Sequence, residues 1–275
     1  MTADVAPGRV RPSSRLRAVL AAAHLGPALA VTVLAGLLAV AADLDAGRIA
    51  LVVAAVLAGQ LSVGWSNDLL DVARDVRSGR TDKPLATGAA SVSVVRTACA
   101  VAVVACVVLS LACGLVAGLV HLLCVAAAWS YNLGLKSTVW SWLPYAVAFG
   151  GLPVFVALAG STAPPWWWPV GGALLGVGAH LLNVLPDLDD DAATGVRGLP
   201  HRLGARWIAP VAAVVLVSAT AVVLVGSTPA PGWTLGVGVL VLGLAVLVVG
   251  GRGRLPFAAA VAIALVDATL LVVAR

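Results

Sequence analysis

Long apolar runs separated by short polar segments are the feature that most restricts what this chain can fold into. Nine such runs cover roughly residues 18–42, 47–67, 91–112, 114–133, 141–161, 166–186, 206–226, 232–250 and 255–274. A helix of ~20 apolar residues crosses the ~30 Å hydrocarbon layer and satisfies its own backbone hydrogen bonds. The runs lack the alternation of polar and apolar residues typical of a transmembrane β-barrel. The pattern therefore predicts an all-α polytopic membrane protein with nine transmembrane helices.

The composition excludes the soluble classes of protein. Of the 275 residues, 61% are hydrophobic and 11% are charged, and the mean hydropathy is +1.05. A soluble domain has ~25% charged residues. The composition therefore argues against a soluble enzyme, a disordered chain and a nucleic-acid-binding protein. The net charge of +5 is explained by membrane topology and by contact with anionic lipid, so we expect membrane lipid and no nucleic acid among the partners.

The distribution of basic residues predicts the orientation. With the N-terminus in the cytoplasm, every Lys and Arg except Arg48 and Arg275 falls on the cytoplasmic side, as the positive-inside rule requires. We expect a multi-pass protein of the cell membrane, with its acidic loops also cytoplasmic. Residues 1–17 are expected to form a mobile cytoplasmic tail, and 18–275 a single domain whose first apolar run is a retained helix.

The acidic residues gather in two short stretches. All twelve acids are Asp, and eight of them lie at Asp68, Asp71, Asp75, Asp82, Asp187, Asp189, Asp190 and Asp191. Both stretches contain N-x3-D-x3-D, offset by 116 residues, and the same offset relates Gly79 to Gly195, Pro84 to Pro200 and Gly88 to Gly204. Because the stretches end the second and sixth apolar runs, both open on the same face. The offset predicts a parallel internal repeat of four helices, plus one extra helix.

The spacing within the first stretch predicts a cation site. Spacing of four places Asn67, Asp71 and Asp75 on one helix face. Two carboxylates ~4 Å apart repel by roughly 4 kcal/mol at an effective dielectric constant of 20. Inert, solvated helix ends are the simpler interpretation, but so many converging acids favour bound cations. Carboxylate and amide oxygens suit Mg²⁺, which gives the candidate metal ligands Asn67, Asp68, Asp71, Asp75, Asp187, Asp189 and Asp191.

Basic residues flank both acidic stretches. Arg80 and Lys83 follow the first stretch, Arg197 follows the second, and Lys136 lies between the fourth and fifth apolar runs. Lys and Arg side chains bind phosphate oxygens that a metal leaves free. For any single one of these residues, the positive-inside rule is also a sufficient explanation. Lys83 and Arg197 are the strongest candidates, because each lies in a segment bounded by Gly and Pro that is able to fold over a ligand.

At these residues the sequence resembles the UbiA superfamily of intramembrane prenyltransferases. The family's first signature, NDxxDxxxD, is matched by Asn67, Asp68, Asp71 and Asp75. Its second signature, an acidic Dx(D/E)xD set, is matched by Asp187, Asp189 and Asp191. The loops at 79–85 and 195–204 resemble the segments that follow the two signatures in the family.

The resemblance implies nine helices around a central chamber, and two Mg²⁺ ions that bridge the diphosphate of a polyprenyl donor. It implies catalytic roles for Asp71, Asp75, Asp187 and Asp191, and substrate-binding roles for Asn67, Lys83, Lys136, Arg197, Arg80, Asn183 and Tyr131. The family has a Tyr and a Lys four residues apart in mid-chain. Here Tyr131 and Lys136 are five apart and Asn132 occupies the matching position, so the chain departs from the pattern there.

The implied function is Mg²⁺-dependent transfer of a prenyl group from a polyprenyl diphosphate to a small acceptor within the membrane, with an aromatic compound or a quinone precursor as the candidate acceptors. No obligate protein partner is evident. One alternative is a membrane terpene cyclase of the same superfamily, in which the prenyl cation closes on its own chain. A more distant alternative is a cation transporter. Transporters carry ionisable groups near the bilayer midplane, whereas Asp267 is the only Asp well inside a predicted span, which argues against transport.

Overall fold

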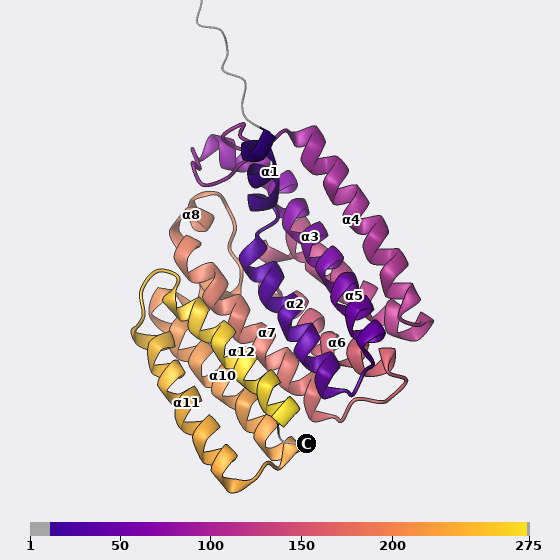
Figure 1. The fold of residues 1–275 in the computed structure, drawn as a ribbon. Coiled ribbons are helices and arrows are strands. Elements are labelled where there is room, and N and C mark those ends of the chain that lie inside the picture. The colour runs from indigo at the N-terminus through magenta and orange to yellow at the C-terminus, as the bar shows by residue number, and fades with distance from the viewer. Residues whose placement is uncertain (1–11, 274–275) are drawn as a thin grey trace, which may run out of the picture.

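The structure is a computed structural model that describes residues 12–273, and within this range every regular element is helical. The elements are α1 (Pro12–Ala21), α2 (Leu25–Ala41), α3 (Ala46–Arg77), α4 (Val92–Ala112), α5 (Leu115–Leu133), η1 (Leu135–Ser137), α6 (Leu143–Ala159), α7 (Trp167–Val184), η2 (Leu185–Asp187), α8 (Leu188–Ala193), α9 (Leu199–Leu203), α10 (Ala205–Ser227), α11 (Pro231–Gly250) and α12 (Leu255–Val273). The predicted all-α fold is confirmed (Figure 1).

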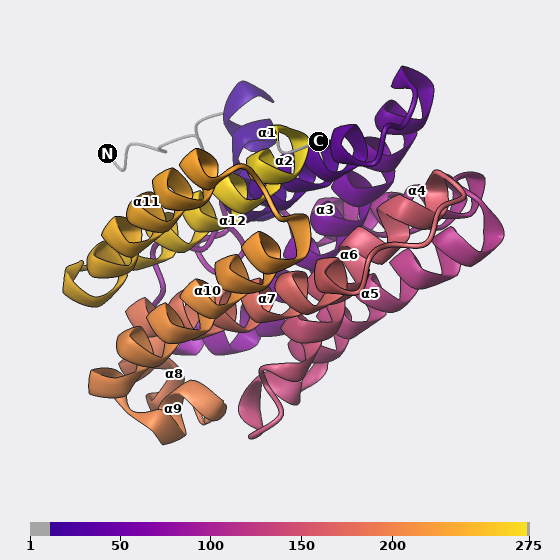
Figure 2. The same cartoon turned by 90° about the horizontal axis from the view of Figure 1, so that it is seen from below.

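The longer helices form a closed bundle. In chain order, α2 to α7 and then α10 to α12 each pack on the next, and α12 packs back on α2. Contacts between α7 and α12 and between α2 and α6 cross the bundle. Seen from below, α11 and α4 lie on opposite sides (Figure 2). The largest buried apolar cluster joins α7, α10, α11 and α12, and a second joins α2, α3 and α6.

The described helices have the length and composition of a membrane protein. Six helical segments are long and apolar enough to cross a membrane: 46–77, 92–112, 115–133, 167–193, 205–227 and 231–250. Three shorter apolar helices, 25–41, 143–159 and 255–270, accompany them. Large apolar side chains such as Val101, Leu123 and Val246 are more than 60% exposed on the outer helices. Such extensive exposed apolar surface is typical of a face that contacts lipid or a partner.

The first apolar run is not the single helix that the sequence predicted. The chain turns at residues 22–24, where His24 has a left-handed backbone with φ 53°, and α2 begins only at Leu25. Pro27 explains the break. A proline inside a continuous helix has no N–H to donate and clashes with the carbonyl four residues earlier, here Ala23, whereas the first turn of a new helix tolerates it.

The turn between α1 and α2 packs tightly on α3. Ala22 and Ala23 are fully buried, and a Cβ at Gly64 would lie 2.1 Å from the Ala23 carbonyl oxygen. The absence of a side chain at Gly64 therefore allows the two backbones to approach. Residues 12–17 of the predicted tail belong to α1, and residues 1–11 of that tail lie outside the described range.

The two acidic stretches adopt different backbones. α3 continues through the first stretch to Arg77, whereas the second stretch changes to a 3₁₀ turn at Leu185–Asp187 and then to the short helix α8. Pro186 causes this change, because it cannot donate the next helical hydrogen bond.

The loops after the two stretches do share local conformation. Gly79 and Gly195 have φ 68° and 84°, and Gly88 and Gly204 have φ 73° and 80°. Each pair is separated by the predicted offset of 116 residues. Positive φ is accessible to Gly without the steric cost that a Cβ adds. The match is a local likeness of two loops, and the four-helix repeat as a whole stays a prediction.

Substitution of Gly64 by Ala should destabilise the fold. The new methyl group would meet the Ala23 backbone, and overpacking of this kind costs ~1–3 kcal/mol. We expect a lower Tm in detergent, measured by thermal unfolding. Gly236→Ala in α11 is the matched control, because a Cβ there meets nothing within 4 Å. Equal Tm values for the two variants would contradict the close contact.

Candidate active site

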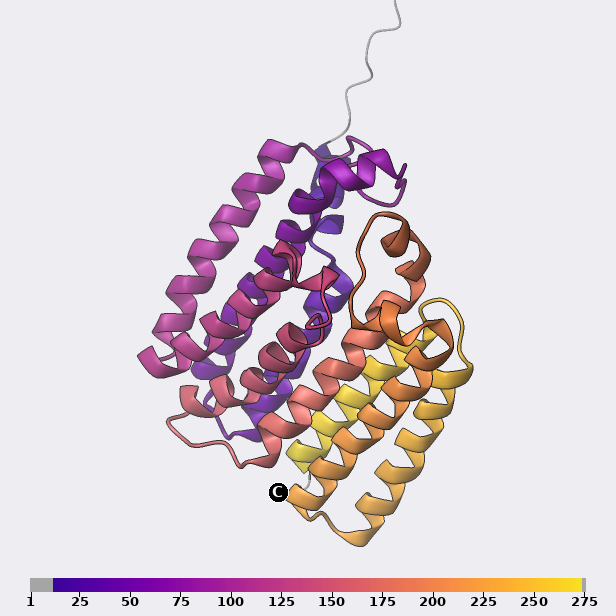
Figure 3. The ribbon, with the colours of Figure 1, turned by 180° about the vertical axis from the view of Figure 1, so that it is seen from behind.

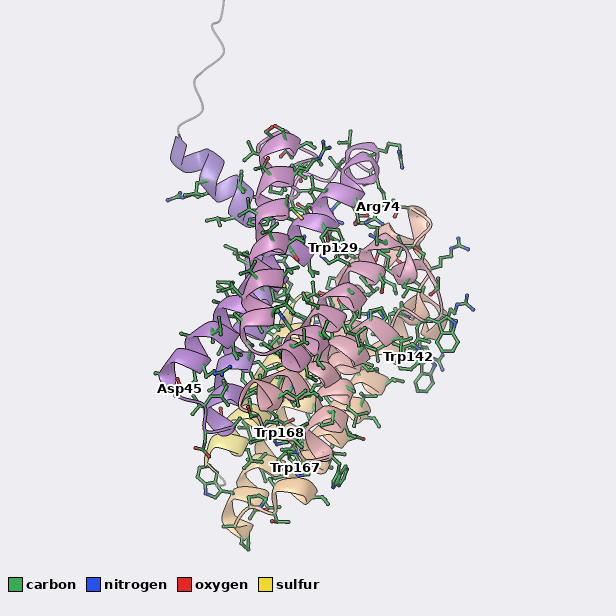
Figure 4. The ribbon with its side chains drawn as sticks, turned by 90° about the vertical axis from the view of Figure 1, so that its right-hand side faces the viewer. Asp45, Arg74, Trp129, Trp142, Trp167 and Trp168 are labelled. Atoms are coloured by element: carbon green, nitrogen blue, oxygen red, sulfur yellow. The ribbon has the colours of Figure 1, made fainter. Side chains whose placement is uncertain are left out.

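The two acidic stretches lie at one end of the bundle. The first occupies the C-terminal part of α3, and the second occupies η2 and α8. Figure 3 shows the loop from α8 to α9 at the same end of the bundle as α1. Arg74 lies toward this end in Figure 4, while Trp167 and Trp168 lie toward the other. We call the end of the bundle that contains Arg74 and the two acidic stretches the acidic end. The opposite end, which contains Trp167 and Trp168, is called the distal end.

Asp68 is the most deeply buried acid of the first stretch, with 1% of its surface exposed. Lys83 Nζ donates to its Oδ1 over 2.6 Å, and His24 Nε2 lies 3.0 Å from the same oxygen. Lys83 Nζ also lies 3.1 Å from His24 Nε2. Asp68 Oδ2 is buried and has no hydrogen-bond partner among the described residues. The turn before α2 and the loop after α3 therefore meet at one carboxylate.

Asp71 lies among donors from three residues, two of them on α3 and one on η1. Lys136 Nζ donates to both of its oxygens over 2.7 and 2.6 Å, and Arg74 Nη2 donates to Oδ2 over 2.7 Å. Asn67 Nδ2 lies 3.3 Å from the same Oδ2. Arg74 also forms a longer ion pair of 3.8 Å with Asp75. Lys136 comes from η1, so the connection between α5 and α6 closes over the acidic face of α3.

Asn132 links α5 to the acidic face of α3 through hydrogen bonds. Its Nδ2 donates to the Val63 carbonyl over 3.0 Å and to Ser66 Oγ over 2.8 Å, and its Oδ1 accepts from Asn67 over 3.3 Å. Asn132 is therefore a buried link between α5 and α3. Its position also sets where Lys136 enters the site.

Arg80 joins the two acidic stretches. It donates to both oxygens of Asp82 over 2.8 Å, and its Nη1 lies 3.4 Å from Asp187 Oδ1. The hydrogen bonds from Arg80 lower the pKa of Asp82 to about 2, and the Asp82 carboxylate in turn raises the pKa of Arg80 further above its ordinary value. Both Arg80 and Asp82 therefore stay charged at neutral pH.

The second stretch is more open than the first. Asp189 and Asp190 are exposed, and Asp191 is half-buried. A hollow of about 360 Å³ is lined by Leu188, Asp189, Ala192, Arg197 and His201. The exposed Arg197 side chain makes no hydrogen bond or ion pair within residues 12–273. The open stretch thus leaves carboxylate oxygens and one guanidinium accessible to a ligand.

An aromatic cluster lies beside the charged groups. Tyr131 and Tyr145 meet edge to face with their centroids 5.3 Å apart, and His180 lies 4.8 Å from Tyr145. Phe149 continues the row one turn along α6, stacked on Tyr145 at 6.3 Å. Asn183, the counterpart of Asn67 in the second stretch, donates to the Tyr145 hydroxyl over 3.3 Å.

The structure therefore brings most of the predicted site residues together. Around the first stretch it places Asn67, Asp68, Asp71, Asp75, Lys83 and Lys136, and Arg80 connects this group to Asp187. Asp189, Asp191 and Arg197 lie along the second stretch, whereas Tyr131 and Asn183 belong to the aromatic cluster. In the described part of the chain, no three His, Cys or Asp side chains converge as a ready metal site. Lys and Arg side chains compensate the buried carboxylates.

Three contributors to the site were not predicted as such. His24 was assigned to the interior of a helix, and only the turn caused by Pro27 brings it to Asp68. Arg74 was not among the predicted site residues, although its three-residue spacing from Asp71 is a signal for an ion pair. Asn132 carried a signal in its four-residue spacing from Lys136.

A closed bundle of apolar helices, with acidic and basic residues gathered at one end, is the architecture of an intramembrane prenyltransferase. The model of the UbiA prenyltransferase family matches residues 28–268, and the chain belongs to this family. No curated protein sequence matches it.

Solved structures of the same fold agree with this assignment. The apo structure of a UbiA homolog from Aeropyrum pernix K1 is 17% identical, with a TM-score of 0.73, over 96% of this chain and 98% of that one. A UbiA homolog from Archaeoglobus fulgidus bound to GPP and Mg²⁺ is 14% identical, with a TM-score of 0.68, over 93% and 99%. A digeranylgeranylglyceryl phosphate synthase is 16% identical, with a TM-score of 0.62, over 94% and 98%.

Removal of Lys83 should destabilise the fold through Asp68. Lys83→Met leaves a buried carboxylate without its ammonium partner, and loss of one member of such a pair costs on the order of 3 kcal/mol. We expect a lower Tm in detergent with EDTA present. The double variant Lys83→Met/Asp68→Asn should recover part of the loss, because the uncompensated charge is gone. A double variant less stable than the single one would argue against this ion pair.

Proposed function

We propose that the protein transfers a prenyl group from a polyprenyl diphosphate to a small acceptor within the membrane, in a reaction that depends on Mg²⁺. The observation that carries this proposal is the pair of acidic stretches at one end of an apolar bundle, joined by Arg80 and surrounded by Lys and Arg. The Archaeoglobus homolog whose structure contains GPP and Mg²⁺ supports the choice of donor and metal.

The acidic residues are chemically suited to Mg²⁺. Their donor atoms are carboxylate and amide oxygens, which this hard cation prefers, and the buried Asp68 Oδ2 has no hydrogen-bond partner within the described range. We assign the metal to Asn67, Asp68, Asp71, Asp75, Asp187, Asp189 and Asp191, as two ions. When bound, the metal neutralises charge on the leaving diphosphate. Asp71, Asp75, Asp187 and Asp191 are the carboxylates that we place nearest the reacting groups.

The cations near the acidic stretches have two roles in this proposal. In the structure, Lys83 and Lys136 compensate the charges of Asp68 and Asp71. With Mg²⁺ at those carboxylates, the two ammonium groups would be available to bind phosphate oxygens. Arg197 and Arg80 bind the diphosphate from the loops that follow the two stretches, because an Arg side chain bonds two phosphate oxygens at once.

The reaction breaks the bond between C1 of the prenyl group and the diphosphate oxygen, and the electron pair leaves with the diphosphate. The resulting allylic cation accepts an electron pair from the acceptor, which then loses a proton. We assign Tyr131 to stabilise the cation through its ring face, and Asn183 donates a hydrogen bond to the neighbouring Tyr145. Apolar walls exclude water that would quench the cation.

We also propose that all nine longer helices cross the membrane around a central chamber, with the N-terminus and the acidic end in the cytoplasm. The basic residues support this orientation, since the loops and short helices at the acidic end carry Arg80, Lys83, Arg197 and Arg202. The shorter helices α2, α6 and α12 are also apolar, with Asp267 on α12 as the single charged residue among them. They cross if flanking residues extend them or if the bilayer thins locally.

Purified protein tests the proposed function directly. It is incubated with Mg²⁺ and geranyl, farnesyl or geranylgeranyl diphosphate, with a quinone precursor, glycerol phosphate or no acceptor, and the products are separated by mass. A prenylated acceptor supports the proposal. A cyclic hydrocarbon formed without acceptor supports a cyclase instead, and no diphosphate release under any condition contradicts both.

Conversion of the acidic ligands to amides should abolish the reaction. Asp71→Asn and Asp187→Asn each remove a charge that we assign to metal binding, so Mg²⁺-dependent diphosphate release should fall to background, at least a hundredfold. The measurement is release of diphosphate from a prenyl donor. Asp190→Asn is the matched control, because it alters an exposed neighbour outside the assigned set. Full turnover in folded Asp71 or Asp187 variants contradicts the metal assignment.

Removal of Arg197 should weaken donor binding. Arg197→Ala takes away a charge-assisted hydrogen bond to the diphosphate, which is worth ~1.5–3 kcal/mol, so the apparent KM for the donor should rise at least tenfold. Steady-state kinetics with varied donor measure this. Arg202→Ala, on the adjacent helix α9, should leave KM nearly unchanged. Equal KM values for wild type and Arg197→Ala remove Arg197 from the binding role.

A further inference from the structure

Asp267 is a buried carboxyl group far from the acidic stretches. It lies on α12 with 2% of its surface exposed, and its Oδ2 accepts a hydrogen bond from Thr220 Oγ1 of α10 over 3.1 Å. Its Oδ1 is buried and finds no hydrogen-bond partner in the described chain. Ionisable groups inside membrane helices are costly and typically functional. Thr220 therefore provides a hydrogen-bond partner for only one of the two carboxyl oxygens.

A second unpartnered polar atom lies on the same cavity. Trp168 Nε1 of α7 is buried without a partner among residues 12–273, and both Trp168 and Asp267 line a cavity of about 40 Å³. The other lining residues are apolar or glycine, apart from Trp167. A water molecule needs ~10–15 Å³ of such volume and two or more polar partners. The cavity therefore has room for about three water molecules, with a donor and an acceptor to bind them.

The cavity extends the aromatic cluster toward the distal end. Phe149 lines it and also stacks on Tyr145. On α7, the lining residue Leu175 is eight residues before Asn183, a rise of ~12 Å at 1.5 Å per residue. Trp168 lies a further two turns away, toward the distal end (Figure 4). A chain that starts with its diphosphate at the acidic end and follows these walls meets Asp267 and Trp168 last.

We propose that Asp267 and Trp168 form a polar end wall, hydrated by ordered water, that limits the length of the prenyl donor. This inference rests on the proposed function. A hydrocarbon tail long enough to reach the wall displaces the water and offers no hydrogen bond in return. Each buried group left unpaired in this way weakens binding about tenfold or more. The wall thus favours donors whose tails end before it.

Donor preference in an end-wall variant tests the proposal. We compare kcat/KM for Mg²⁺-dependent diphosphate release from geranyl, farnesyl and geranylgeranyl diphosphate. Wild type should prefer a shorter donor to geranylgeranyl diphosphate. Asp267→Leu should raise kcat/KM for geranylgeranyl diphosphate at least tenfold, with little change for the geranyl donor. Asp267→Asn is the matched control and should keep the wild-type preference, because the wall remains polar.

A second variant keeps the proposal testable if Asp267→Leu does not fold. Trp168→Phe removes Nε1–H and keeps an aromatic body, and it should shift preference in the same direction by a smaller factor. The proposal is overturned if wild type does not discriminate among the donors, or if both variants keep the wild-type ratio. If wild type releases diphosphate from none of the three donors, the proposed function itself fails, which is a separate outcome.

Discussion

The interaction on which the site depends is the compensation of buried carboxylates by amines brought from distant parts of the chain. Asp68 and Asp71 are nearly inaccessible to water, and unpaired charges in such surroundings are expensive. Lys83 reaches Asp68 from the loop after α3, and Lys136 reaches Asp71 from the turn after α5. These two ion pairs tie the loops at the acidic end to α3, so the same contacts organise the fold and assemble the candidate active site.

The two ends of the bundle differ in the chemical character of their side chains. Charged groups gather at the acidic end, where the backbone turns repeatedly at Gly and Pro, whereas close helix contacts such as Gly172 against the Phe149 carbonyl hold the distal half together. Between the ends, Tyr145 and Phe149 form an aromatic wall on α6. This division suits a substrate with a charged head and an apolar tail, and it gives a physical reason for the scarcity of charge elsewhere in the chain.

Much of the fold and part of the site could be predicted from the sequence. Apolar runs located the helices because length and hydropathy are local properties, and the Asp spacing identified the first acidic face because α3 stays helical through it. The break at His24 was missed, although Pro27 carried the signal, because a proline near a helix start is compatible with either a kink or a new helix. His24 at Asp68 could not be predicted, since that contact joins residues 44 apart.

By itself, then, the sequence determined the helical class, the acidic and basic residue types and the family signatures, because these are properties of composition and spacing. Tertiary structure alone decided which cation meets which carboxylate, that Asn132 links α5 to α3, and that Asp267 and Trp168 face one cavity. Pairings of this kind depend on how the helices pack, and helices that are almost uniformly Ala, Val, Leu and Gly carry little pattern to indicate their neighbours. Only the packed bundle shows where the few polar groups meet.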